Sequence, residues 1–234
     1  MSSQPSPLRG RAELVLTLLL VMAAVVVAGS SVFGVVAQRG GIEDPPAPVI
    51  KYVAEWERGL PHGRLVFGAD QAPLTILALV DLECGACAQF NRILKEVLPA
   101  FGDSVRVVYV HYPLRQHRFA TPAANAAECA YRQAGATGFQ RWVDLVYLKA
   151  DSLGLKSWES YAGEADLPDP VGIHACAVRN EPDPVVTEGL AFGLQLEFLG
   201  LPMFFVNGWR LVGSPDPDEL RRVLELVLKG RAPG

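Results

Sequence analysis

The sequence has neither an excess of positive charge nor many cysteines. Its 234 residues include 21 lysines and arginines against 25 aspartates and glutamates, and the formal net charge is −4. Nucleic-acid-binding domains usually carry a basic patch or stripe, so no nucleic acid is expected among the partners. The four cysteines, Cys84, Cys87, Cys129 and Cys176, allow at most two disulfides, and only in an oxidising compartment.

Metal-binding motifs are scarce as well. The chain has one C-x-x-C, formed by Cys84 and Cys87, and neither a second C-x-x-C nor an H-x-x-x-H. A structural zinc site needs two further ligands, so no metal and no other cofactor is expected. A copper-handling protein remains an alternative. We would expect it to have a C-x-x-x-C with histidines or methionines nearby, and here only Met203 fits.

The N-terminal segment contains the longest uncharged stretch, residues 14–37, preceded by Arg9 and Arg11. A helix of about 20 apolar residues crosses the roughly 30 Å hydrocarbon layer of a membrane. Basic residues on its N-terminal side favour a cytoplasmic N-terminus. The sequence therefore predicts a cytoplasmic tail at 1–11 and a single-pass anchor at 12–38. A cleaved signal sequence is the alternative, and both place the rest of the chain outside the cytoplasm.

A linker at 39–60 is predicted to precede one domain at 61–234. The linker begins with a stretch rich in glycine and proline, which is typical of a chain leaving a membrane. The apolar run at 74–80 predicts a strand buried on both faces. A helical apolar stripe from Phe90 to Leu98 follows it, and then a second strand at 105–110. This order is that of a βαβ unit.

The remainder of the domain divides into a helical part and a hairpin. Residues 113–185 have mostly helical patterns, which predicts a helical insertion. Asn207-Gly208 lies between two short apolar runs, a strong hairpin signal because both residues tolerate positive φ. Asp216-Pro217 then predicts the start of an amphipathic helix.

The C-x-x-C lies between the buried strand and the amphipathic helix that follows it. Disulfide exchange needs a thiolate that attacks and a second thiol within reach. At the first turn of a helix, free backbone N–H groups and the helix dipole stabilise the thiolate of Cys84, and Cys87 can resolve the mixed disulfide. A zinc half-site and a purely structural disulfide are the alternatives. The setting between a strand and a helix favours redox chemistry.

Three segments resemble the DsbA-like thiol–disulfide oxidoreductases, in their membrane-anchored bacterial branch. They are residues 68–90, with residues 81–87 around the cysteines at the centre, then Tyr112-Pro113-Leu114, and the loop at 200–208. The resemblance implies a thioredoxin-like α/β fold with an inserted helical domain, preceded by one transmembrane helix. It also implies that the Leu201–Pro202 peptide bond is cis and that Pro202 faces the active cysteines. Expected partners are exported proteins with cysteines and a membrane redox protein that recycles the pair.

Other residues near the motif are supporting candidates. Asp81 either caps the helix or relays a proton to or from Cys87, and His117 follows the second strand of the βαβ unit. Backbone groups near Leu201 are expected to pair with an extended substrate segment. Glu83 should oppose formation of the Cys84 thiolate by like-charge repulsion. A fold kept only for partner binding is a further alternative, although both cysteines of the motif are present.

Cys129 and Cys176 lie in the predicted helical insertion among apolar neighbours. Two buried free thiols are one interpretation, because cysteine behaves as a small hydrophobe. Export of the chain favours pairing, since thiols outside the cytoplasm tend to be oxidised. Many DsbA-like proteins carry a second bridge in this region. We therefore expect a structural disulfide that takes no part in catalysis.

Overall fold

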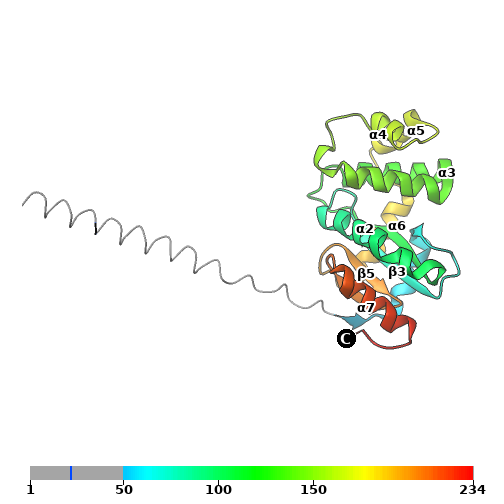
Figure 1. Cartoon of the computed structure of the whole chain (residues 1–234). Coiled ribbons are helices and arrows are strands. Elements are labelled where there is room, and N and C mark those ends of the chain that lie inside the picture. Colours follow the sequence, from blue (N-terminus) through cyan, green and yellow to red (C-terminus); the bar gives the residue numbers. More distant parts are fainter. Residues whose placement is uncertain (1–21, 23–49, 234) are drawn as a thin grey trace, which may run out of the picture. The chain divides into compact units, whose positions relative to one another are not determined.

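The computed structural model describes residue 22 and residues 50–233 (Figure 1). The predicted cytoplasmic tail, nearly all of the predicted anchor and the first part of the linker lie outside these residues. No helix in the described part of the chain is long and apolar enough to cross a membrane.

A six-stranded sheet forms the centre of the domain, with the order β1-β6-β5-β3-β4-β2. Strands β3 and β4 run parallel, and all other neighbours are antiparallel. The strands are β1 (Lys51–Tyr52), β2 (Gly63–Phe67), β3 (Leu74–Val80), β4 (Val105–His111), β5 (Met203–Val206) and β6 (Trp209–Val212).

Strand β3 is buried along its whole length, as its apolar sequence predicts. Ile76, Ala78 and Val80 belong to the core cluster on one face, and Leu77 and Leu79 to the cluster on the other. Alternate side chains of a strand point to opposite faces, so a central strand covered on both sides needs apolar residues at nearly every position.

Helices cover both faces of the sheet. Helices α2 and α7 pack on one face, while α6 and the 3₁₀ helix η1 contribute to the core on the other. Helices α3, α4 and α5 form a layer beyond α2 (Figure 1). The helical elements are η1 (Ala54–His62), α2 (Gly85–Val97), η2 (Leu98–Ser104), α3 (Ala120–Leu148), η3 (Ala150–Ser152), α4 (Trp158–Glu164), α5 (Pro170–Ala177), α6 (Pro184–Gln195) and α7 (Pro217–Leu228).

The structure extends the predicted elements at two places. Residues 51–60, which the sequence analysis assigns to the linker, form β1 and most of η1, and β1 pairs with β6. The helical region also continues past residue 185, because α6 follows the predicted insertion directly. Asp183 caps α6 by accepting a hydrogen bond from the Val185 N–H at 3.1 Å, and Pro184 occupies the first helical turn.

The C-terminal hairpin and helix form where the sequence predicts them. Asn207 and Gly208 connect β5 to β6 with φ of 43° and 92°. The side chain of Asn207 also accepts a hydrogen bond from the Thr75 N–H at 2.8 Å, which ties the turn to β3. Asp216 caps α7 through the Asp218 N–H at 2.9 Å. The hairpin thereby aligns β5, and the loop before it, with β3.

Candidate active site

The two cysteines of the motif lie where α2 begins. Cys84 is the N-cap residue, with extended backbone angles, and Cys87 lies in the first helical turn. Both are free thiols, Cys84 half-buried and Cys87 fully buried. A Cβ placed on Gly85 would have no neighbour within 4 Å, so the helix end beside Cys84 is open. A partner can therefore approach the first sulfur and is kept from the second.

The surroundings of the two thiols shift their pKa values in opposite directions. The pKa of Cys84 falls from 9.0 to about 6, chiefly because its sulfur is hydrogen-bonded by the Cys87 thiol. Partial burial opposes this change, and the backbone N–H groups of Cys87 and Ala86 add to it. Burial raises the pKa of Cys87 well above its ordinary value, and the hydrogen bond to Cys84 raises it further. At neutral pH, Cys84 is the thiolate and Cys87 retains its proton.

Asp81 lies beneath the motif, with its side chain fully buried. One carboxylate oxygen accepts from the Glu83 N–H at 2.7 Å, and the other accepts from the Leu114 N–H at 2.8 Å. The second oxygen also lies 2.8 Å from Nδ1 of His117. The backbone of Asp81 additionally hydrogen-bonds Cys87 and the Cys84 N–H. The carboxylate thus joins the turn before Cys84 to the loop after β4.

The structure brings Asp81 and His117 together although they are 36 residues apart. Partial burial lowers the pKa of His117, but the hydrogen bond to Asp81 and the nearby negative charges outweigh it and raise the pKa above the usual 6.5. The carboxylate therefore favours the protonated imidazolium. The partly exposed imidazole of His117 therefore lies against the buried carboxylate.

The structure does not support the expected repulsion between Glu83 and the Cys84 thiolate. Its carboxylate accepts a hydrogen bond at 2.5 Å from the N–H of Phe119, the N-cap residue of α3. An anion is stabilised at such a helix N-terminus. The charge that opposes ionisation of Cys84 is that of Asp81. Glu83 therefore connects the active-site turn to the helical layer, a contact that the sequence does not signal.

The loop before β5 lies at the same end of the sheet as the cysteines. The Leu201–Pro202 peptide bond is cis, the geometry that the family resemblance implies. Met203 pairs with Leu79 near the end of β3, and the chain continues from β3 through Asp81 to Cys84. The carbonyl of Pro202 accepts from the Gly213 N–H at 2.8 Å. Leu201 packs against the same core cluster as Cys84.

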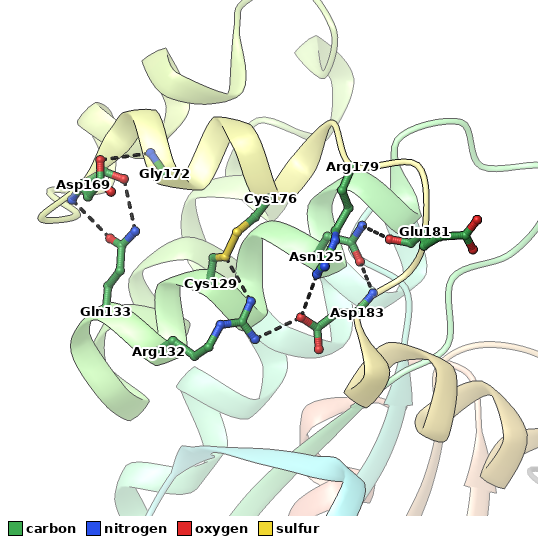
Figure 2. The surroundings of a disulfide bond; sticks show 10 residues. All are labelled: Asn125, Cys129, Arg132, Gln133, Asp169, Gly172, Cys176, Arg179, Glu181 and Asp183. Carbon is green, nitrogen blue, oxygen red and sulfur yellow. Dashed lines mark hydrogen bonds and ion pairs between the residues drawn. A yellow bond between two sulfur atoms is a disulfide. The ribbon is translucent and has the colours of Figure 1, made fainter.

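Cys129 and Cys176 form a disulfide that links α3 to α5 (Figure 2). Their Cα atoms are 6.4 Å apart, within the usual range for a disulfide. Arg132 donates to the sulfur of Cys129 at 3.0 Å and pairs with Asp183 at 2.9 Å. Arg179 pairs with the same carboxylate at 3.2 Å. The bridge and these ion pairs join α3, α5 and the start of α6.

Metal binding receives no geometric support from the described residues. Within residues 50–233 and residue 22, no group of three histidine, cysteine, aspartate or glutamate side chains could hold a metal ion.

A family model described as thioredoxin matches residues 62–226. Pseudomonas aeruginosa DsbA2 is 25% identical in structural alignment, with a TM-score of 0.58 over 73% of this chain and 97% of that one. A periplasmic thioredoxin-like protein from Salmonella enterica is 18% identical, with a TM-score of 0.57 over 76% and 99% of the two chains. The thioredoxin-like fold with a helical insert is therefore confirmed.

Curated relatives extend the comparison to longer proteins. The Na(+)/H(+) antiporter NhaA of Herminiimonas arsenicoxydans is 31% identical over 211 residues, which cover 86% of this chain and 31% of the antiporter. NhaA 1 of Mycolicibacterium gilvum is 30% identical over 77% of this chain and 29% of its own length. This chain thus spans about a third of these relatives. Such broad alignments include most of the thioredoxin region, so the relatives contain a comparable region.

Proposed function

Because this chain belongs to the thioredoxin family, in its DsbA-like form, we propose that it exchanges disulfides in exported proteins through Cys84 and Cys87. The opposite pKa shifts of these thiols carry the proposal. An accessible thiolate beside a buried, protonated thiol is the arrangement that two-step exchange requires.

In the reducing direction, the Cys84 thiolate attacks one sulfur of a substrate disulfide and releases the other as a thiolate. Cys87 then loses its proton and attacks the sulfur of Cys84, which releases the second substrate sulfur. The enzyme pair ends as a disulfide, and the substrate has gained two electrons. The reverse sequence oxidises a substrate dithiol, and the direction depends on the potentials of the two pairs.

Asp81 is the group that we assign to proton transfer with Cys87. It is buried beneath the motif, and its charge reaches both thiols. His117 contacts the carboxylate and is partly open to solvent, so it can exchange the proton with water. Asp81 can thus accept the proton of Cys87 when the mixed disulfide forms, and His117 can pass that proton to water.

The loop with Leu201 and Pro202 is proposed to hold the substrate beside Cys84. Among the described residues, no hydrogen bond pairs the backbone N–H or C=O of Leu201. An extended substrate segment can use these groups in the manner of an added strand. Such pairing binds the substrate backbone, so recognition of particular substrate side chains depends on other surfaces.

The domain is proposed to act outside the cytoplasm. The Salmonella structural neighbour is itself periplasmic. Residues 12–38 would supply either the single-pass anchor or a cleaved signal, and a membrane redox protein would recycle the cysteine pair. Because antiporters carry a comparable region, an ion transporter is one membrane protein with which such a domain can be associated. Ion transport itself is not proposed for this chain.

Turnover measurements with the full-length chain in detergent test this function. We expect reduction of a protein disulfide with dithiothreitol as electron donor, and a trapped mixed disulfide with Cys87→Ser. Tight Cu(I) binding without exchange would instead support a metal-handling protein. Absence of both activities would support a binding module.

A further inference from the structure

A cleft of about 590 Å³ lies between the loop that follows β4 and α6. Leu114 from the loop and Leu190 and Leu194 from α6 supply apolar surface. The side chain of Leu194 is 74% exposed. An exposed apolar surface bordered by polar groups is typical of a binding site.

The ionisable side chains that line this cleft at its polar side are basic. Arg115, His117 and Arg118 line it, and none of the described lining residues is acidic. Arg115 forms no ion pair with the described chain, and the guanidinium of Arg118 lies 5.4 Å above the ring of Phe119. The whole chain has a net charge of −4, so this cluster does not reflect overall composition.

Several other arginines of the domain form ion pairs. Arg64 contacts the buried carboxylate of Glu128 at 2.7 Å, and Arg132 contacts that of Asp183 at 2.9 Å. Those cations hold the fold together. Arg115 and Arg118 are exposed and retain their capacity to bind an anion from outside.

Hydrogen bonds connect this cleft directly to the redox motif. Asp81 accepts from the backbone of Leu114 and from His117, both of which line the cleft. The Cys84 N–H in turn donates to the carbonyl of Asp81 at 3.2 Å. A chain segment in the cleft therefore lies next to the turn that carries the attacking sulfur.

Building on the proposed function, we propose that this cleft selects acidic substrate polypeptides. A segment beside the reacting cysteine would place its carboxylates against Arg115 and Arg118, and an apolar side chain against Leu190 and Leu194. Complementary charge of this kind raises association rates and rejects partners of the wrong sign. The Leu201 loop would bind the substrate backbone, and the cleft would select the substrate by its charge.

Paired peptides with one disulfide test this specificity. One peptide carries two glutamates close to its cysteine, and its match carries two glutamines. We expect wild-type kcat/KM to favour the acidic peptide about fivefold, since two exposed ion pairs contribute modestly. The double variant Arg115→Gln/Arg118→Gln should lose this preference. The variant Arg115→Glu/Arg118→Glu should favour a peptide with two lysines instead.

Arg231→Gln is the matched control, because Arg231 is exposed and lies near the C-terminus, away from the residues of the cleft. It should keep the wild-type preference, and added salt should weaken that preference. Equal rates for both peptides with the wild type would overturn the proposal, as would an equal loss in the control. Reaction with a small aromatic disulfide reports the thiol pair alone, so failure of that reaction would count against the proposed function instead.

Discussion

The two cysteine pairs of this chain differ in almost every physical respect. Cys84 and Cys87 are three residues apart at an open helix end, and both are free thiols. Cys129 and Cys176 are 47 residues apart and join two helices of the insertion. The first pair has one accessible sulfur and two shifted pKa values, whereas the second is held among packed helices and ion pairs (Figure 2).

This difference shows how surroundings assign a role to cysteine. Free N–H groups stabilise a thiolate at the start of α2, which suits Cys84 to the exchange role that we propose for it. A bridge that closes a long loop instead restricts the unfolded chain. We therefore assign chemistry to the first pair and stability to the second.

Replacing Cys84 should have the largest effect. Cys84→Ser removes the attacking thiolate, so exchange turnover should fall on the order of a thousandfold or more. Cys87→Ser should also stop turnover, but it should retain the first attack and accumulate mixed disulfides. Non-reducing electrophoresis with mass spectrometry distinguishes these results. Trapping of partners by Cys84→Ser would reverse the assignment of the two roles.

Removing the second pair should affect stability and leave turnover nearly unchanged. For Cys129→Ala with Cys176→Ala, loss of the bridge should lower the free energy of unfolding by about 4 kcal/mol by the chain-entropy estimate. Denaturant unfolding measures this loss. Exchange assayed where the double variant is still folded should match the wild type. A large loss of exchange there would make this pair a second redox relay.

The ionisation of Cys84 should separate it clearly from an ordinary thiol. With a pKa of about 6, its thiolate fraction at pH 7 exceeds that of a thiol with the ordinary value of 9.0 by about a hundredfold. The alkylation rate of the reduced protein should rise with pH through this midpoint and then level off. Because the folded pKa is lowered, this ionisation stabilises the reduced protein fully above pH 9. The stabilisation is lost as the pH falls towards 6.

Asp81→Asn should slow the resolving step more than the first attack. Its amide cannot take the proton of Cys87, so decay of the mixed disulfide should slow by about tenfold or more at neutral pH. Attack by Cys84 should be nearly unchanged, since Cys84 is already mostly thiolate at neutral pH. Single-turnover kinetics separate the two steps. Equal slowing of both would indicate a general disturbance of the fold.

His117→Gln should give the smallest effect, and the effect should depend on pH. The folded pKa of His117 is raised, so its pairing with Asp81 contributes fully below the unfolded value of 6.5. This contribution is lost as pH rises through the folded pKa. The difference in unfolding free energy between wild type and variant should therefore be larger in acid than in alkali. A difference that does not change with pH would show that the Asp81–His117 ion pair does not contribute to stability.

Local patterns in the sequence predict most elements of the sheet and the position of the C-x-x-C at the start of a helix. The buried strand β3, the hairpin at Asn207-Gly208 and the capped helix α7 all follow from short-range signals. Helix α6 is not among the predicted elements, although Asp183-Pro184 is the same type of start signal as Asp216-Pro217. Phe192 of α6 packs with Leu77 and Leu79 of β3, which is the second apolar layer that a strand buried on both faces requires.

Contacts between distant residues could not be predicted in the same way. Glu83 looked like a repulsive charge beside Cys84, and only the tertiary structure turns it towards the Phe119 N–H. Asp81 and His117 were candidates separately, but no spacing rule links residues 36 positions apart. The pair forms because β3 and β4 are parallel neighbours whose ends bring both loops together.

One redox titration tests the division between the two pairs most directly. The full-length chain is equilibrated in thiol–disulfide buffers, its free thiols are alkylated, and mass spectrometry counts the label on each cysteine. We predict that Cys84 and Cys87 titrate between about −120 and −270 mV, the span of exchange enzymes, while Cys129 and Cys176 stay oxidised to below about −300 mV. Titration of both pairs together, or of Cys129 and Cys176 first, would contradict the account.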